Sequence, residues 1–191
     1  MNIFLIGYRG TGKSTVAPAL ANRLGPPWNW LDLDADLETQ AGRSIAELFA
    51  TEGEAGFRDR ESRVLANVAR GDRQVVATGG GVVLRQENRD LLRTGWIVWL
   101  TASAETIAKR VEQDALTASR RPNLTTKGGR EEIRQLLQQR VPLYQQLAHL
   151  VMDTEIASAE TLAEQIAASW RARPADAGNV SPRKSRTLRE T

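Results

Sequence analysis

The chain has 191 residues, a length typical of one compact domain. Hydrophobic residues make up 41% of it and charged residues 26%, which excludes collagen-like, coiled-coil and wholly disordered chains. Cysteine is absent, so disulfide scaffolds, thiolate metal sites and cysteine nucleophiles are excluded too. No apolar run is long enough to span a membrane, and the first residues do not have the pattern of a signal peptide. We therefore expect a soluble cytoplasmic protein without a membrane partner.

The charges nearly balance, with 26 lysines and arginines against 23 aspartates and glutamates, a formal net charge of +3. Residues 174–191 account for +2 of this charge, through four basic and two acidic side chains. So small an excess does not indicate nucleic-acid binding. All but four of the basic residues are arginines, which suit bidentate recognition of phosphate and carboxylate groups.

Along the chain, short apolar runs alternate with stretches of helical composition. The apolar runs predict five strands, at about residues 2–6, 28–33, 74–77, 96–100 and 150–152. The other stretches predict helices at about residues 13–24, 54–69, 104–111, 131–147 and 159–171. A capping box beginning at Ser44 indicates a further helix start. Alternating strands and helices favour an α/β fold, with a parallel sheet covered by helices on both faces.

Two stretches differ from the compact part of the chain. Residues 114–129 are polar and contain Pro122 and Gly128-Gly129, so we predict a mobile lid over about residues 113–129. Residues 174–191 hold no aromatic residue and few aliphatic ones, which predicts a disordered basic tail. The predicted domain therefore covers residues 1–173.

A phosphate-binding loop is the strongest motif. Residues 7–14 read Gly-Tyr-Arg-Gly-Thr-Gly-Lys-Ser, which fits Gly, four residues, Gly-Lys-Ser/Thr, between a predicted strand and a predicted helix. The glycines let several backbone N–H groups point at one anion, and the start of the helix adds its positive dipole end. Lys13 can reach the β- and γ-phosphates of a nucleotide, and the Ser14 hydroxyl can bind Mg²⁺.

Two carboxylates follow the second predicted strand. Asp32 and Asp34 lie near its C-terminal end, where ligands bind in open parallel sheets. Alternation along a strand would direct both side chains to the same face, where one could serve a metal-bound water and the other an alcohol. Equally, they could be the acids that favour the start of a helix. The spacing leaves both interpretations open.

Four more features contain arginine or glycine. Arg58 lies on a charged helix, where an arginine is usually solvated or ion-paired. Gly79-Gly80-Gly81 directly follows a strand, as in segments where a ligand approaches the backbone closely. Arg120-Arg121-Pro122 lies in the polar loop, and Arg140 lies near the end of a helix. Each feature taken alone is better explained by structure than by function.

Taken together, these residues resemble the shikimate kinase family over about residues 2–170. The similarity rests on residues 7–15, Asp32-Leu33-Asp34, Ser44-Ile45, Gly53-Glu54, Phe57-Arg58, Gly79-Gly80-Gly81, Arg121-Pro122 and Arg140-x-Pro142-Leu143-Tyr144. The resemblance implies a three-layer α/β/α P-loop kinase fold related to the nucleoside monophosphate kinases. It further implies a central five-stranded parallel sheet, a substrate-binding helical region at about residues 33–61 and a mobile lid.

The resemblance also implies a reaction. Members of the family phosphorylate the 3-hydroxyl of shikimate with ATP and Mg²⁺, giving shikimate 3-phosphate and ADP in chorismate and aromatic amino-acid biosynthesis. ATP and shikimate are the expected partners, nucleic acid is not expected, and we expect a monomer.

The same resemblance assigns residues to these roles. The expected shikimate contacts are Asp34, Arg58, Gly80 and Arg140, with both arginines pairing with the carboxylate. Asp34 would hold the ring hydroxyls and accept the proton. Lys13 and Arg121 would stabilise the transferring phosphoryl group, with Ser14 as a direct Mg²⁺ ligand and Asp32 as a water-mediated one. The expected contacts to ATP are Gly10, Thr11, Gly12, Lys13, Ser14, Thr15 and Arg121.

Two alternatives share the phosphate-binding loop. A gluconate-type or other small-metabolite P-loop kinase would share the loop and the fold. A nucleotide-binding regulatory module would use the basic tail to contact nucleic acid, but aromatic residues are not interleaved with the basic ones there. Arg9 stands at a loop position that is often apolar in the shikimate kinase family, and its role is open.

Overall fold

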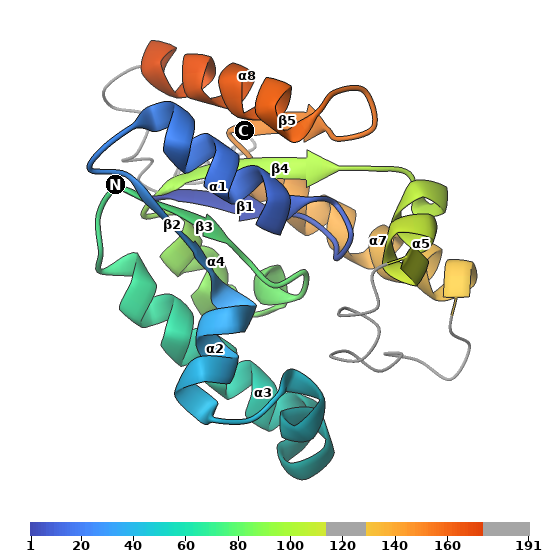
Figure 1. Cartoon of the computed structure of the whole chain (residues 1–191). Helices are drawn as coiled ribbons and strands as arrows, with labels where there is room; N and C mark the ends of the chain where they lie inside the picture. The colour runs from blue at the N-terminus through green and yellow to red at the C-terminus, as the bar shows by residue number, and fades with distance from the viewer. Residues whose placement is uncertain (114–128, 174–191) are drawn as a thin grey trace, which may run out of the picture.

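A parallel sheet of five strands forms the centre of the computed structural model, which describes residues 1–113 and 129–173 (Figure 1). The strands are β1 (Ile3–Ile6), β2 (Asn29–Asp32), β3 (Gln74–Ala77), β4 (Trp96–Thr101) and β5 (Leu150–Asp153). Their order across the sheet is β2-β3-β1-β4-β5, and every neighbouring pair is parallel. All five predicted strands are confirmed, with ends moved by at most one residue.

Helices cover both faces of the sheet. The described elements are α1 (Lys13–Leu24), α2 (Leu33–Ala41), α3 (Ile45–Ala69), the 3₁₀ turn η1 (Val82–Leu84), α4 (Gln86–Leu92), α5 (Ala104–Gln113), α7 (Gly129–Leu147) and α8 (Ala159–Ala172). The three-layer arrangement implied by the resemblance is confirmed. The predicted tail, Arg121 and residues 114–128 of the predicted lid lie outside the described residues.

Helices α1 and α8 lie side by side on one face (Figure 1). Their apolar side chains form one core with the residues of β1, β3 and β4 that point to this face, such as Ile3 and Leu5. Pro18 lies inside α1, and the helix continues through it, although its ring nitrogen cannot donate the usual bond to the carbonyl four residues earlier. Trp170 of α8 closes the core against Trp28 and Trp96, with ring centroids 5.3 and 5.6 Å away.

The opposite face carries α2, α3, α4, η1 and α7. Phe4 and Ile6 of β1 point to this side, and they pack in a second core with residues such as Leu48 of α3 and Tyr144 of α7. A smaller third core joins Tyr8 to α5 and α7, through residues such as Ile107 and Ile133. The phosphate-loop segment is therefore packed against the two helices that flank residues 114–128.

Helix α3 is longer than predicted, because the Ser44 capping box and the predicted helix at 54–69 belong to the same element. Ser44 Oγ accepts the Glu47 N–H at 3.2 Å, and the Glu47 carboxylate accepts the Ser44 N–H at 2.7 Å. The helix kinks at Gly53, whose φ is 67°. The kink redirects the first part of α3, so Phe49 and Phe57 from its two parts stack with centroids 4.5 Å apart.

All strands run parallel, so their C-terminal ends lie at one edge of the sheet. β1 occupies the middle of the sheet, with β3 on one side and β4 on the other. After β1 the chain forms β2 and β3 in one half of the sheet, and then crosses β1 to form β4 and β5 in the other half. A crevice at such a crossing is the usual ligand site of an open parallel sheet. Within residues 1–113 and 129–173, no helix is long and apolar enough to cross a membrane.

Candidate active site

The phosphate-binding loop occupies residues 7–12, between β1 and α1. Gly12 precedes the first helical residue in a left-handed conformation, with φ 82° and ψ 14°, and its carbonyl accepts the N–H groups of Thr15 and Val16. Thr11 closes the turn, because its hydroxyl donates to the Tyr8 carbonyl at 2.7 Å. The N–H groups at the start of α1 and the helix dipole make this end of the helix suited to an anion.

Lys13 curls back over the loop. Its ammonium group donates to the carbonyls of Gly7 at 2.9 Å and Tyr8 at 2.8 Å, and the residue is only 7% exposed. On the other side, Arg110 of α5 donates to the Gly10 carbonyl at 3.3 Å and to Thr154, which follows β5. The loop is thereby joined to two further segments, and no motif in the sequence pointed to Arg110.

Asp32 lies beside the start of α1, but the strand-face interpretation of Asp32 and Asp34 is wrong. β2 ends at Asp32, and Asp34 lies in the first turn of α2. Asp32 caps that helix, since its Oδ1 accepts the N–H of Asp34 at 3.0 Å and that of Ala35 at 3.3 Å. Its Oδ2 accepts a hydrogen bond from the Ser14 hydroxyl. Asp32 therefore both caps α2, as the alternative interpretation had it, and contacts the phosphate loop.

Asp34 instead faces the triple-glycine segment after β3. A Cβ built on Gly79 would lie 3.0 Å from Asp34 Oδ1 and 2.7 Å from Glu61 Oε1. The two carboxylates therefore approach the same backbone segment, one from α2 and one from α3. Asp34 is partly exposed, whereas Glu61 is 1% exposed.

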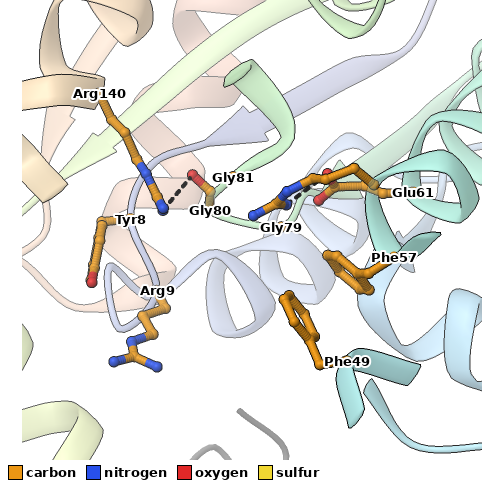
Figure 2. A pocket seen from close by; sticks show the side chains of 10 residues that line it. Tyr8, Arg9, Phe49, Phe57, Glu61, Gly79, Gly80, Gly81 and Arg140 are labelled. Atoms are coloured by element: carbon orange, nitrogen blue, oxygen red, sulfur yellow. Dashed lines mark hydrogen bonds and ion pairs between the residues drawn. The ribbon is translucent and has the colours of Figure 1, made fainter. Parts of the chain in front are cut away.

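A pocket opens beside the loop at the same edge of the sheet (Figure 2). It brings together three of the predicted residues, Arg58, Gly80 and Arg140, which come from α3, the segment after β3, and α7. Its remaining lining residues are Tyr8, Arg9, Phe49, Phe57, Glu61, Gly79 and Gly81. The pocket thus has arginines on two sides and two stacked phenyl rings on another, an arrangement suited to a small carbon ring that carries an anionic group.

The Arg58 guanidinium is buried and ion-paired. Its Nη1 donates to Glu61 Oε2 at 2.8 Å, and its Nη2 lies 3.4 Å from Oε1 of the exposed Glu54. Burial raises the pKa of Glu61, and the neighbouring Arg58 opposes that effect. The guanidinium also lies close to the backbone, since a Cβ on Gly81 would lie 2.4 Å from Arg58 Nη2.

Arg140 and Arg9 approach the pocket from the other side. Arg140 Nη1 donates to the Gly80 carbonyl at 3.3 Å, and its guanidinium lies 5.5 Å from the centre of the Tyr8 ring (Figure 2). Arg9 Nη2 lies 3.6 Å from Oε1 of the buried Glu132, in the first part of α7. Arg9, whose role was open, thus joins the phosphate loop to α7 through Glu132.

Several pocket residues have no role in any motif that the sequence displays. Tyr8, Phe49 and Glu61 had no assigned role, although Glu61 is three residues after Arg58 on the same helix and so within reach of it. His149 directly precedes the edge strand β5, and its Nδ1 accepts the Ile97 N–H at 3.0 Å. Desolvation lowers the pKa of His149.

A phosphate-binding loop at the centre of a three-layer parallel fold, beside a pocket lined by buried arginines, defines a P-loop kinase. The family model for shikimate kinase matches residues 9–171. A shikimate kinase from Rhodopirellula baltica is 47% identical over 154 residues, covering 80% of this chain and 81% of that protein. The chain belongs to the shikimate kinase family.

Solved structures agree with this assignment. The shikimate kinase from Acinetobacter baumannii, in complex with shikimate, has a TM-score of 0.80 and 37% identity, over 86% of this chain and 89% of that one. A gluconokinase from Sinorhizobium meliloti has a TM-score of 0.52 and 17% identity, over 88% of this chain and 92% of that one. That second likeness is one of fold alone.

We expect Glu61→Gln to destabilise the protein by about 3 kcal/mol, because it removes one partner of a buried ion pair and leaves the Arg58 charge uncompensated. Urea unfolding at neutral pH measures this difference. The matched control is Glu54→Gln, which removes the exposed partner of the same arginine and should cost at most about 1 kcal/mol. Equal losses in the two variants would contradict the assignment of Glu61 as the principal partner.

Proposed function

We propose that this protein transfers the γ-phosphoryl group of ATP to the 3-hydroxyl of shikimate, giving shikimate 3-phosphate and ADP. The observation that carries the proposal is the pocket beside the phosphate loop, where buried Arg58 and Arg140 flank the triple-glycine segment. Two buried cations that line one pocket select an anionic acceptor, and arginine pairs with a carboxylate through parallel hydrogen bonds. The stacked rings of Phe49 and Phe57 supply an apolar wall for the carbon ring.

The phosphate loop binds the nucleotide in this proposal. Backbone N–H groups of residues 10–15 surround the phosphates, and Lys13 exchanges its bonds to the loop carbonyls for bonds to the β- and γ-phosphates. Arg121, which lies outside the described residues, would add a second cation to the transferring group. Phosphoryl transfer requires positioning and charge stabilisation rather than a covalent intermediate, and the proposed cations serve that need.

Asp34 and the triple-glycine segment position the attacking hydroxyl. The Asp34 carboxylate lies against Gly79, which lines the proposed acceptor pocket. We assign to it the role of orienting the 3-hydroxyl and accepting its proton as the oxygen–phosphorus bond forms. Arg58 and Arg140 hold the carboxylate, so the ring is presented in one orientation. Residues 33–61 form the acceptor-binding region in this proposal, within a catalytic domain of residues 1–173.

Ser14 and Asp32 fit a site for Mg²⁺. Their hydrogen bond places a hydroxyl and a carboxylate oxygen together at the start of α1, and Mg²⁺ prefers such hard oxygen donors. Residues 1–113 and 129–173 contain no cluster of three or more acidic or histidine side chains for a metal. Mg²⁺ at kinase sites needs only one or two protein oxygens in addition to phosphates and water. Bound with ATP, the ion would neutralise charge on the phosphates, while Ser14 contacts it directly and Asp32 through water.

A coupled assay of ADP release tests the proposed reaction. With ATP and Mg²⁺, we expect turnover with shikimate and none above background with gluconate or with nucleoside monophosphates. The reason is that only shikimate combines the carboxylate, the ring and the hydroxyl that the pocket is proposed to hold. Turnover of gluconate without turnover of shikimate would overturn the proposal.

Replacing Asp32 by asparagine separates the proposed metal role from the capping role. Asparagine caps a helix about as well as aspartate, so the free energy of unfolding should stay within about 0.5 kcal/mol of the wild type. The Mg²⁺ concentration for half-maximal rate should rise about tenfold, because the carboxylate that would hold a metal-bound water is lost. Asp36→Asn, in the first turn of the same helix, is the control and should leave the Mg²⁺ titration unchanged. An unchanged titration in Asp32→Asn would remove Asp32 from the metal site.

Gly81→Ala tests the role of Arg58 while leaving the arginine in place. The added Cβ would meet the Arg58 guanidinium at 2.4–2.6 Å and displace it. Losing one charged hydrogen bond costs about 1.5–3 kcal/mol, so the KM for shikimate should rise about 10- to 100-fold while the KM for ATP stays nearly constant. Gly71→Ala is the matched control, because the nearest neighbours of its added Cβ are the Gln74 side chain and the Val68 carbonyl, neither of which lines the pocket. Equal increases in both KM values would exclude a specific contact between Arg58 and the acceptor.

A further inference from the structure

Tyr144 is buried behind the pocket and does not line it. It lies on α7 one turn after Arg140, so both side chains are on the same face of the helix. Both donate to one acceptor: the Tyr144 hydroxyl lies 2.6 Å from the Gly80 carbonyl oxygen, and Arg140 Nη1 lies 3.3 Å from it. Figure 2 shows Arg140 directed at this carbonyl from above the triple-glycine segment.

The two hydrogen bonds are unequal. The tyrosine bond is short, and the arginine bond is long for a charged donor. Arg140 is 5% exposed, and its Nε has no hydrogen-bond acceptor within the part of the chain that the structure describes. The guanidinium is thus weakly held by Gly80 and has an N–H to offer an anion.

We propose that Tyr144 is a positioning residue for the acceptor, because its hydroxyl keeps the Gly80 carbonyl paired when Arg140 leaves that carbonyl to bind the acceptor's carboxylate. This inference rests on the proposed function. In residues 1–113 and 129–173, Arg140 and Tyr144 are the two side chains that donate to Gly80 O. Without the hydroxyl, binding would leave a buried carbonyl without a donor, which is costly.

The surroundings of Tyr144 keep its hydroxyl a donor. Burial raises the pKa of Tyr144 well above its ordinary value, so the phenol stays protonated at all physiological pH values. Its ring is 0% exposed and stacks on Trp99 of β4, with centroids 5.8 Å apart and planes 28° apart. A ring held on one side by the sheet cannot follow Arg140, so the hydrogen bond to Gly80 stays when the guanidinium moves.

Tyr144→Phe is the direct test, because it deletes the hydroxyl and keeps the ring. We expect the KM for shikimate to rise about five- to tenfold, with kcat and the KM for ATP within about twofold of the wild type. The discriminating substrate is the methyl ester of shikimate, which has no carboxylate for Arg140. Tyr144→Phe should change the kinetic constants for the ester by less than twofold, because Arg140 then has no reason to leave Gly80. An equal loss with shikimate and its ester would show a merely structural role and overturn the inference.

A double-mutant cycle gives a second test, read by calorimetric binding of shikimate so that slow variants can still be measured. In an Arg140→Met background, Gly80 O loses Arg140 in the free and bound states alike, so adding Tyr144→Phe should change the Kd by less than twofold. Additive effects of the two substitutions would contradict the coupling.

Leu147→Val serves as the packing control. It disturbs the buried face of α7 but keeps the Tyr144 hydroxyl and the Trp99 stack, so its KM for shikimate should match that of the wild type; a rise as large as that of Tyr144→Phe would assign the effect to packing. If wild-type protein does not phosphorylate shikimate, the proposed function fails. If the wild type is active and Tyr144→Phe leaves the KM for shikimate unchanged, only the inference about Tyr144 fails.

Discussion

The parallel pairing of β1 with both β3 and β4 is the constraint on which the site depends. Leu5 is in register with Ala77 of β3 and Val98 of β4, so the segments that follow these strands leave the sheet at one edge. Thr78 strengthens the exit of β3, because its N–H and its hydroxyl both donate to the Leu5 carbonyl, at 3.1 and 2.9 Å. The triple-glycine segment is thereby packed on the phosphate loop, since a Cβ on Gly80 would lie 3.1 Å from Arg9 N. The phosphate loop and the triple-glycine segment are therefore in contact. A phosphoryl group can pass directly between two substrates only if their binding segments adjoin in this way.

Buried arginines give the site its positive charge, and they also reduce the stability of the fold. Arg9, Arg58 and Arg140 each have an Nε that is buried and has no hydrogen-bond acceptor among the described residues. The terminal nitrogens of each guanidinium do have an oxygen partner. Glu132 pairs with Arg9, Glu61 pairs with Arg58, and the Gly80 carbonyl accepts from Arg140. Buried donors without acceptors destabilise a fold, and they gather at functional sites where a ligand supplies the missing acceptor. The same buried donors that destabilise the fold favour the binding of an anionic acceptor in this pocket.

The fold was largely predictable because its signals are local. A strand such as β1 is a short apolar run that ends at a glycine, and α1 begins at the residue that the phosphate-loop pattern indicates. The Ser44 capping box is likewise a contact between residues three apart. Helix α2 was only one of two open interpretations and α4 was not predicted, because elements of nine and seven residues have weak patterns of their own and depend on packing against the sheet and α3. The prediction that Asp32 and Asp34 point to one face of a strand was wrong. β2 ends at Asp32, so Asp34 lies in α2 and not in the strand.

The sequence by itself determined the class of the protein, the position of its phosphate loop, and the residue types available for an anionic acceptor. These are properties of short segments, whose spacing and composition restrict the backbone directly. Only the tertiary structure decided which arginines face one another, that Glu61 holds Arg58, and that Tyr144 and Arg140 meet at the carbonyl of Gly80. Gly80 is 60 residues from Arg140 and 64 from Tyr144 along the chain. No local pattern records such a contact, because sheet register and helix packing create it only when the chain is folded.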